Sequence, residues 1–301
     1  MILEKLKYLF FDVQNDWQIG IIKSSLHSYI FTDNNSKIHW LKCKFNVYQA
    51  DPFAIEKDGL IYLFYEEYLK EKKYAILKCS VYNSSLEILQ ESVILDDGTH
   101  KSFPLIFEFE GTFYMIPESG VISKLILYEC VNFPFDWVEK KTIFNFPCSD
   151  SVMKNINGVW HLYYTKSNVQ SENEKLFLRT SDNLFCDWNQ EIEICIKNDL
   201  RSARNAGNIY LLNKKYFRFS QKCMNYYGES IVVNEIIESS EFDYKEVEIG
   251  EKKLIRKNST GFHTLNATKN FVFVDRRHQR LKLKSFFSII KLIASKINIY
   301  K

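Results

Sequence analysis

Asp51-Pro-Phe-Ala-Ile, followed by Asp58-Gly-Leu-Ile-Tyr-Leu-Phe-Tyr, is the stretch of sequence that decides the fold. It predicts a short apolar strand, a tight turn and a second strand rich in aromatic residues. The same arrangement returns in Ser102-Phe-Pro-Leu-Ile with Glu110-Gly-Thr-Phe-Tyr, and in Ser149-Asp-Ser-Val-Met with Asn157-Gly-Val-Trp. Strand-built repeats of about 40–50 residues are typical of the blades of a β-propeller.

Two looser copies of the repeat follow, beginning at Arg204-Asn-Ala-Gly and Gly261-Phe-His-Thr. Two further strands come after each of the first four copies, which gives four antiparallel strands to a blade. The fifth copy lacks its outer strands, and Asp16-Trp-Gln-Ile-Gly-Ile-Ile and Lys37-Ile-His-Trp near the N-terminus can supply them. We therefore predict an all-β fold, a five-bladed β-propeller over residues 1–276 whose N-terminal strands close the last blade.

The composition agrees with one large β domain. Of the 301 residues, 46% are apolar and 16% are aromatic, which is enough for a substantial core of pleated strands. The seven cysteines are odd in number and form no Cys-x-x-Cys pair, so we expect neither a disulfide framework nor a structural zinc site. The N-terminal residues lack the continuous apolar segment of a signal peptide. A cytoplasmic location is therefore expected.

The C-terminal segment, residues 277–301, differs from the body in charge and pattern. Between Arg276 and Lys301 there are eight Lys and Arg residues and no acid; removing these eight from the 40 basic residues leaves 32 against 37 acidic ones. An acidic body argues against a nucleic-acid partner. Apolar residues recur at helical spacing in the tail, at Phe286, Ile289, Ile290, Ile293 and Ile297.

This tail predicts a basic amphipathic helix over residues 277–301. It either lies on an anionic membrane surface or packs on the flank of the propeller or on a partner. The cluster of cations without acids favours the membrane, since anionic headgroups attract such a helix. The protein would then be peripheral at the inner face of the membrane.

The strand register places polar residues around one mouth of the axial channel. The innermost strand of each blade begins at this mouth, and the second strand, being antiparallel, ends there. The first strands begin at Asp51, His100–Ser102, Ser149 and Asp150, Arg201–Arg204, and His263; the second strands end at Glu66 and Glu67, Glu118, Thr165 and Lys166, Ser220 and Gln221, and Asp275 and Arg276. We expect acidic side chains of the first three blades to meet basic and amide side chains of the last two.

Three carboxylates of this ring, Asp51, Glu118 and Asp150, are candidate catalytic residues. Glycosidic bonds are usually handled by two carboxyl groups, one acting as base or nucleophile and one held protonated as the acid. Asp51 and Asp150 each have a structural interpretation as turn residues. Glu118 ends an apolar run, where a carboxylate gains little from packing, which favours a function.

Six more residues are candidates for substrate binding. Arg201, Arg204 and Arg218 could bind a phosphate or a uronic acid through paired hydrogen bonds, or form salt bridges with the acidic half of the ring. His263 could bind a ligand, transfer a proton or be structural. His100 and Gln221 complete the set. The histidines are dispersed, and we predict no bound metal and no cofactor.

Several segments, taken together and in order, resemble known propellers. They are Ala50-Asp-Pro-Phe, His100-Lys-Ser-Phe-Pro, Met115-Ile-Pro-Glu-Ser, Phe133-Pro-Phe-Asp-Trp, Arg204-Asn-Ala-Gly, Phe217-Arg-Phe-Ser-Gln, Tyr227-Gly and Gly261-Phe-His-Thr-Leu-Asn. The chain resembles the propellers of glycoside hydrolase families 43, 32 and 68. It is more similar to the propeller domain of glucosamine inositolphosphorylceramide transferases and related bacterial surface-glycan proteins.

The resemblance covers roughly residues 14–276 and implies a carbohydrate-active or carbohydrate-binding propeller, with Asp51 in the place of the catalytic base. The chain departs from the hydrolases at the start of the third blade, where their acidic Glu is replaced by Cys148-Ser149-Asp150. The nearest Glu is Glu118, on a different strand end. Hydrolase activity is therefore not implied by the resemblance alone.

These features favour one function and leave two alternatives open. The first is a glycosyltransferase of bacterial capsule or lipopolysaccharide assembly, with Asp51 as base, Glu118 as acid and Asp150 tuning both. Its substrate would be a sugar or glycan, nucleotide- or lipid-linked. The alternatives are a glycoside hydrolase that uses a carboxylate pair, and a non-catalytic glycan-binding module of a membrane assembly complex.

Overall fold

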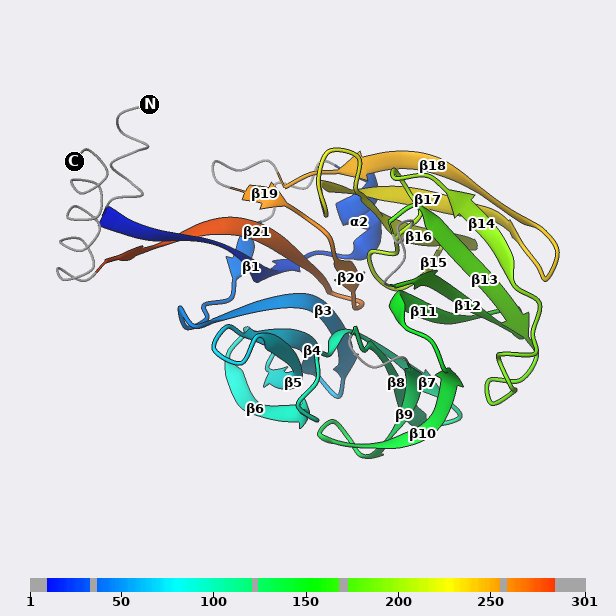
Figure 1. Cartoon of the computed structure of the whole chain (residues 1–301), viewed down its shortest axis with the longest axis horizontal. Helices are drawn as coiled ribbons and strands as arrows, with labels where there is room; N and C mark the ends of the chain where they lie inside the picture. The colour runs from blue at the N-terminus through cyan, green and yellow to red at the C-terminus, as the bar shows by residue number, and fades with distance from the viewer. Residues whose placement is uncertain (1–9, 33–36, 121–123, 168–172, 255–258, 285–301) are drawn as a thin grey trace, which may run out of the picture.

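Five sheets arranged around a common axis form the protein (Figure 1). The structure is a computed structural model that describes residues 10–32, 37–120, 124–167, 173–254 and 259–284. Neighbouring strands within each sheet pair antiparallel. The prediction of an all-β, five-bladed propeller is confirmed.

The first four blades each contain four strands in sequence order. Blade 1 contains β3 (Val47–Lys57), β4 (Leu60–Leu69), β5 (Tyr74–Tyr82) and β6 (Ile88–Leu95). Blade 2 contains β7 (Ser102–Phe109), β8 (Thr112–Glu118), β9 (Leu125–Asn132) and β10 (Asp136–Phe144). Blade 3 contains β11 (Cys148–Ile156), β12 (Val159–Lys166), β13 (Lys175–Ser181) and β14 (Ile194–Asn198). Blade 4 contains β15 (Tyr210–Leu212), β16 (Lys215–Lys222), β17 (Ser230–Ser239) and β18 (Tyr244–Lys252).

Blade 5 is built from both ends of the chain, as predicted. β21 (Phe271–Leu283) pairs with β19 (Ser259–Gly261), with β20 (Leu265–Ala267) and with β1 (Phe11–Lys23), which in turn pairs with β2 (Ile38–Trp40). A short helix, α2 (Leu26–Phe31), follows β1. The β1–β21 register runs unbroken from Phe11 opposite Leu283 to Lys23 opposite Phe271. These backbone hydrogen bonds close the ring, so that blade 5 has no free edge between the two ends of the chain.

β21 corrects the predicted boundary between the propeller and the tail. Residues 277–283, which we assigned to a helix, continue β21 as a strand paired with β1. Residues 285–301 carry the rest of the predicted helix and lie outside the described residues, so the helix remains a prediction there. In the part of the chain that is described, no helix is long and apolar enough to cross a membrane.

The hairpin turns between the first two strands of blades 1 to 3 share one geometry. Asp58-Gly59, Glu110-Gly111 and Asn157-Gly158 all have positive φ angles at both residues. Two residues with positive φ form the type I′ turn, whose twist matches that of paired strands. The same turn in each blade sets the inner strands in the same register, and their other ends meet at one mouth of the ring.

Candidate active site

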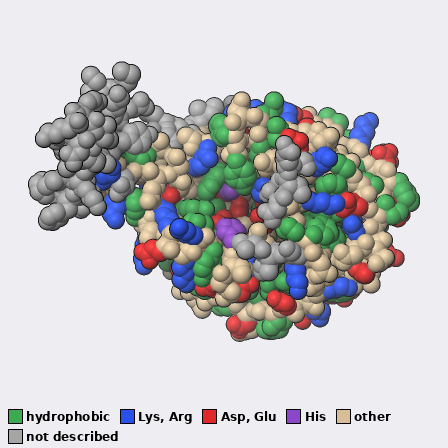
Figure 2. Space-filling model, viewed as in Figure 1, with side chains coloured by type: hydrophobic (Ala, Val, Ile, Leu, Met, Phe, Trp, Pro, Cys, Tyr) green, Lys and Arg blue, Asp and Glu red, His purple; other side chains and the backbone are tan. Residues whose placement is uncertain are grey.

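The predicted residues meet where β3, β7 and β11 begin. In each of these strands one residue has a positive φ, namely Asp51 (51°), Phe103 (45°) and Asp150 (46°), and the ladder to the second strand shifts register there. Such bulges release a backbone N–H from the ladder and re-aim the side chain. Figure 2 shows acidic and histidine side chains in a hollow at the centre of this face. We call this hollow the axial basin.

Each freed N–H group donates to a carboxylate of the preceding blade. The Asp51 N–H donates to Asp275 Oδ2 over 3.2 Å, and the Phe103 N–H donates to Asp51 Oδ2 over 3.2 Å. The Asp150 N–H donates to Glu118 Oε2 over 3.1 Å. Because a buried N–H without a partner costs free energy, these carboxylates stabilise the contacts between blades as well as lining the basin.

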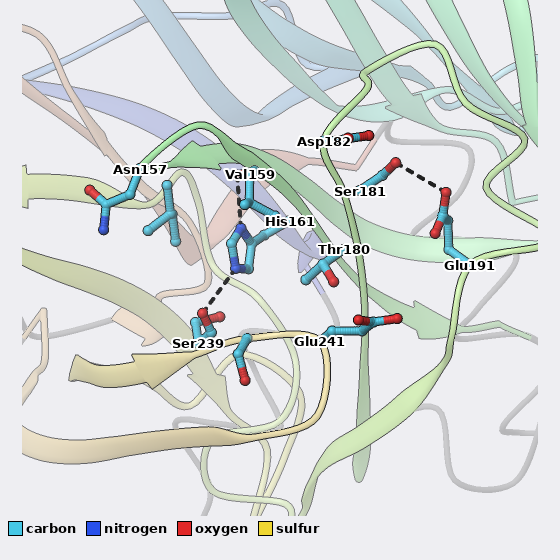
Figure 3. Close-up of a pocket in the computed structure, with 11 residues that line it drawn as sticks. Asn157, Val159, His161, Thr180, Ser181, Asp182, Glu191, Ser239 and Glu241 are labelled. Carbon is cyan, nitrogen blue, oxygen red and sulfur yellow. Dashed lines mark hydrogen bonds between the residues drawn. The ribbon is translucent and has the colours of Figure 1, made fainter.

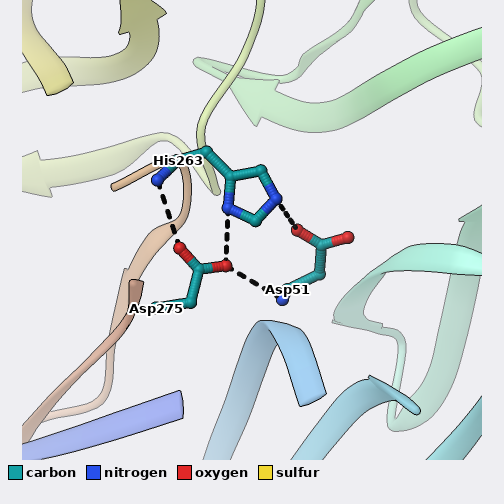
Figure 4. A group of neighbouring side chains, drawn as sticks. All are labelled: Asp51, His263 and Asp275. Atoms are coloured by element: carbon teal, nitrogen blue, oxygen red, sulfur yellow. Dashed lines mark hydrogen bonds and ion pairs between the residues drawn. The ribbon is translucent and has the colours of Figure 1, made fainter. Parts of the chain in front are cut away.

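Asp275, His263 and Asp51 form a chain of polar contacts (Figure 4). His263 Nδ1 lies 2.7 Å from Asp275 Oδ2, and His263 Nε2 lies 3.5 Å from Asp51 Oδ1. Asp275 Oδ1 accepts the N–H groups of His263 and Thr264, at 3.1 and 3.0 Å. Burial lowers the pKa of His263, but Asp275 and Asp51 outweigh it, so the pKa lies above its ordinary value. Asp275 therefore orients the imidazole and favours its charged form.

Asp51 is held from several sides. Its Oδ1 accepts a 2.7 Å hydrogen bond from the Thr264 hydroxyl. Burial raises the pKa of Asp51, while His263 opposes the rise and Asp275 adds to it. Glu66, which lies in β4 opposite Ala50, is buried beside it. Burial, and then the charge and the hydrogen bond of Asp51, raise the pKa of Glu66 well above its ordinary range. Glu66 is therefore held protonated next to Asp51.

Glu118 and Asp150 share one arginine. Arg204 Nε donates to Asp150 Oδ2, and Arg204 Nη2 lies 3.8 Å from Glu118 Oε2. Gln221 Nε2 donates to the same Asp150 oxygen over 2.7 Å. Burial and the negative charge of Asp150 raise the pKa of Glu118 to about 8, against the opposing effect of Arg204. At neutral pH Glu118 is mostly a neutral acid that can give up a proton.

Tyr227 is a residue of this site that the sequence interpretation missed. Its ring lies 5.1 Å from Arg204 Cζ and packs edge-on against His263, at 5.5 Å between centroids. Trp17 stacks on the face of His263 at 3.7 Å, and its centroid lies 6.3 Å from that of Tyr227. Burial raises the pKa of Tyr227, Arg204 opposes the rise, and the charges of Asp150, Asp51 and Glu118 add to it. The Tyr227-Gly pair in the sequence was the available signal.

His100 lies at the rim of the basin, next to Glu118. A Cβ on Gly120 would lie 3.8 Å from both Glu118 Oε1 and His100 Cδ2, which places both side chains beside that glycine. His100 Nδ1 accepts the Ala75 N–H over 3.3 Å. Burial, and the nearby charge of Lys101, lower the pKa of His100. A neutral imidazole therefore faces the basin at this point.

Two of the three arginines are not brought to the basin. Arg201 donates to Glu248 Oε2 over 2.7 Å and lies 3.3 Å from Glu251, both on the outer strand β18. Arg218 is fully buried and donates to both oxygens of Glu246. The expectation that three arginines share one side of the site is corrected: only Arg204 lies there, because outer-strand glutamates pair with the other two.

Several buried polar atoms border the basin without a hydrogen-bond partner among the described residues. Ser119 Oγ and Ser151 Oγ follow Glu118 and Asp150 directly in the chain, and Gln221 Oε1 belongs to the amide that binds Asp150. Buried polar atoms are usually paired. These three atoms are exceptions to that rule among the described residues.

Asp51, His263 and Asp275 are also a group whose ligand atoms lie within 4.8 Å of one another, as a metal site requires. These atoms already bond to each other and to Thr264 and backbone N–H groups. We assign no metal to them, and the expected absence of a metal stays a prediction.

A separate pocket of about 480 Å³ lies between blades 3 and 4, at the opposite end of the strands from the basin (Figure 3). His161 lines it, with Nδ1 3.0 Å from the Val159 carbonyl and Nε2 3.3 Å from the Ser239 carbonyl. Ser181 Oγ donates to Glu191 there over 3.0 Å. None of the predicted site residues lines this pocket, and the axial basin remains the candidate active site.

Comparisons with known proteins agree with this geometry. Residues 41–290 match the family described as glucosamine inositolphosphorylceramide transferase 1, N-terminal. The chain is 32% identical over 207 residues to glucosamine inositolphosphorylceramide transferase 1 of Arabidopsis thaliana, covering 66% of this chain and 27% of that protein. It is 26% identical over 208 residues to the protein of the same name from Oryza sativa subsp. indica, covering 66% and 28%. The chain thus spans a little over a quarter of the length of these relatives.

Two solved structures that superimpose on this chain are glycoside hydrolases. A GH43 β-xylosidase/α-arabinofuranosidase from a compost metagenome, in complex with xylotriose, superimposes with a TM-score of 0.56 at 14% identity, over 78% of this chain and 84% of that one. The catalytic domain of the Coprinopsis cinerea GH62 α-L-arabinofuranosidase gives 0.57 at 10% identity, over 89% and 98%. These likenesses show the fold, and the resemblance inferred from the sequence is confirmed.

Proposed function

The chain belongs to the family of the N-terminal region of glucosamine inositolphosphorylceramide transferase 1, and we propose that its axial basin binds a sugar and catalyses transfer of a glycosyl group. The observation that carries the proposal is the different surroundings of two carboxyl groups. Glu118 has a pKa of about 8 and lies beside Asp150, whereas Asp51 lies 3.5 Å from His263 Nε2, which opposes the rise that burial causes in the pKa of Asp51. Two carboxyl groups whose surroundings push their protonation apart are the usual requirement for chemistry at an anomeric carbon.

In this reaction Asp51 acts as the base and Glu118 as the acid. The acceptor hydroxyl oxygen attacks the anomeric carbon while Asp51 takes its proton. The bond from that carbon to the leaving oxygen breaks, and Glu118 gives its proton to the leaving oxygen. The Thr264 hydroxyl and the Phe103 N–H fix the Asp51 carboxylate during this step. General acid–base catalysis of this kind contributes about 10²–10⁴-fold to a rate.

The other side chains of the basin set the state of this pair and hold the sugar. The charge of Asp150 keeps Glu118 protonated, and Arg204 limits the effect. Tyr227 offers a half-buried aromatic ring at the rim, on which the apolar face of a sugar can stack. Arg204 and His100 flank Glu118 and face the leaving group or a phosphate attached to it.

We place the reaction in the assembly of a bacterial surface polysaccharide, in the cytoplasm at the inner face of the membrane, with a nucleotide- or lipid-linked sugar as substrate. The names of the curated relatives support a transferase. The seven cysteines are all free, as expected in a reducing compartment. The basic residues between Arg276 and Lys301 support attachment to an anionic membrane.

Two other functions each have an observation in their favour. The fold shared with GH43 and GH62 enzymes favours a glycoside hydrolase, in which water takes the place of the acceptor. The bonds from inter-blade N–H groups to Asp275, Asp51 and Glu118 favour a glycan-binding module in which the acids are structural.

The test is to incubate the purified full chain with panels of nucleotide sugars and acceptors, and separately with aryl glycosides. We expect transfer that falls about 10²–10⁴-fold in Asp51→Asn and in Glu118→Gln, because each variant loses proton transfer but keeps an acceptor oxygen for the inter-blade N–H. Glu91→Gln is the control, since Glu91 is a carboxylate of the outer strand β6 that bonds Ser80 and Tyr65.

The outcomes separate the three functions. Unchanged transfer in both basin variants would remove the catalytic assignment. Release of free sugar without transfer would identify a hydrolase. Glycan binding by calorimetry that survives both substitutions, with no turnover of any substrate by the wild type, would identify a binding module.

A further inference from the structure

The paired ends of β1 and β21 extend beyond the ring of blades (Figure 1). We call residues 11–16 of β1 and 278–283 of β21 the ribbon. In an antiparallel pair, residues opposite each other point to the same face. Phe11 is opposite Leu283, and Val13 is opposite Leu281. One face of the ribbon therefore carries four apolar side chains.

The β21 side of this apolar face is exposed, and the β1 side is partly exposed. Leu281 is 47% exposed and Leu283 is 65% exposed, while Phe11 and Val13 are half-buried. Single exposed apolar residues are ordinary, but a contiguous set at the end of a projecting element marks a surface that binds something. The residues that surround the apolar face indicate what kind of partner it binds.

Those neighbours are mainly basic. The ribbon and its ends contain five cationic residues and two acidic ones: Arg276, Arg277, Arg280, Lys282 and Lys284 against Asp12 and Asp16. Asp16 is already paired, 2.6 Å from Lys70 Nζ and 3.2 Å from Arg280 Nη1. A surface with this net positive charge is complementary to an anionic one. A second copy of the chain would bring like charges together, and so would the chain's own residues 285–301, which contain three lysines and no acid.

The apolar face of the ribbon continues along β1 and β21 to residues that contact the side chains of the basin. Along this face, Trp17 follows Phe11, Val13 and Asn15 and lies opposite Arg277. Trp17 stacks on His263, and Arg277 Cζ lies 5.5 Å from the ring of Tyr226, next to Tyr227. A flat surface that contacts the ribbon can therefore also approach the rim of the basin.

We propose that the apolar face of the ribbon inserts into the interface of an anionic lipid bilayer, so that the basin opens toward the membrane and receives a lipid-linked sugar. Aliphatic side chains bordered by cations suit the boundary between headgroups and acyl chains. The proposed membrane docking depends only on the observations of the ribbon. The lipid-linked substrate rests on the proposed function.

The test of docking uses the full chain and vesicles of phosphatidylcholine with or without phosphatidylglycerol. We expect the double variant Leu281→Ser, Leu283→Ser to sediment with phosphatidylglycerol vesicles roughly tenfold less than the wild type. The matched control is Ile88→Ser, Leu89→Ser, which removes an equally exposed apolar pair from the outer strand β6 of blade 1.

The proposal would be overturned if the ribbon variant bound the vesicles as well as the wild type does. It would also be overturned if the control variant lost as much vesicle binding as the ribbon variant. A wild-type dimer in light scattering that the ribbon substitutions dissolve would overturn it too, because the face would then belong to a second copy. The ribbon side chains are exposed, so both variants are expected to fold; circular dichroism checks this.

A second assay separates this proposal from the proposed function. The ribbon variant should turn over a water-soluble acceptor like the wild type, and a vesicle-borne acceptor at least severalfold more slowly. Loss of both reactions, or of neither, would overturn the orientation of the basin toward the bilayer. If the wild type turns over neither acceptor, the proposed function fails, while the vesicle-binding result still decides the docking.

Discussion

Glu118 shows how a single side chain acquires its chemistry from position. It ends an apolar strand, accepts the Asp150 N–H and is flanked by one acid and one arginine. Burial and the Asp150 charge favour its neutral form more strongly than Arg204 favours its anion. The same carboxyl group can therefore hold two blades together and deliver a proton at neutral pH.

At this scale Glu118→Gln should flatten the pH dependence of the free energy of unfolding. The pKa of Glu118 rises from 4.5 to about 8 on folding, so between these values the folded state holds a proton that the unfolded chain has lost. The stabilisation is complete below about pH 4.5 and is lost as the pH rises through about 8. Glu66 and His263, whose pKa values are also raised, act in the same direction in both proteins.

Urea titrations between about pH 5 and pH 8 measure this difference. The wild type should lose up to about 1.4 kcal/mol per pH unit more than the variant, which corresponds to one proton. Parallel curves for the two proteins would show that Glu118 ionises near its ordinary pKa.

The loop between β16 and β17 shows how an element positions a residue of the site. Gly228 has a φ of 64°, and a Cβ there would lie 2.8 Å from the Cβ of His263 and 3.1 Å from the Trp17 ring. Its carbonyl also accepts the Phe262 N–H over 2.7 Å. The loop can therefore lie flat on these side chains, which brings Tyr227 over the basin.

Gly228→Ala should cost both stability and activity. The positive φ alone costs about 1 kcal/mol for an alanine, and the close contact adds to it by displacing Tyr227 or His263. Gly98→Ala is the matched control, because Gly98 has a φ of 79° and nothing within 4 Å of the added Cβ. Thermal unfolding and the KM for the sugar are the measurements. Equal effects of the two substitutions on both would mean that the contact of Gly228 has no role in placing the loop.

The ribbon is the second element whose role depends on its surroundings. Inside the ring, the partners of β1 and β21 bury both of their faces, with Ile19 and Val274 fully buried. Beyond the ring their alternating pattern gives one apolar and one polar face, and the polar face bonds to residues of blade 1, through Asp16 to Lys70 and through Arg280 to the Val47 carbonyl. The docking surface proposed here is thus a continuation of the strands that close blade 5.

For the whole molecule, much of the fold could be predicted because one pattern repeats. The paired turn at Asp58-Gly59, Glu110-Gly111 and Asn157-Gly158 fixes the register of three blades. That register alone is enough to bring Asp51, Glu118 and Asp150 to one mouth, although they lie far apart in sequence. The need for outer strands in blade 5 likewise predicted the N-terminal closure.

The strand register could not predict where the charged groups at the ends of long side chains lie. Arg201 and Arg218 begin near the mouth, but their guanidinium groups reach Glu248 and Glu246 on the outer strand β18. Nor could it choose between Glu66, which is buried at the basin, and the neighbouring Glu67, which is only partly buried and faces Lys78. The strand at residues 277–283 was missed because its basic residues merge with those of the predicted helix.

Across the whole molecule, the five blades meet so closely that burial and the charge of Asp150 hold Glu118 in its neutral form. The pKa of the Glu118 carboxyl group is the most direct measure of how closely the blades bring these side chains together. A pH titration of the side-chain ¹³C carboxyl signal in glutamate-labelled protein, assigned by its absence from Glu118→Gln, reports it without any substrate. A midpoint about 8 is the predicted result. A midpoint near the ordinary value of 4.5 would contradict the account, because Glu118 would then be an anion at neutral pH with no proton to give.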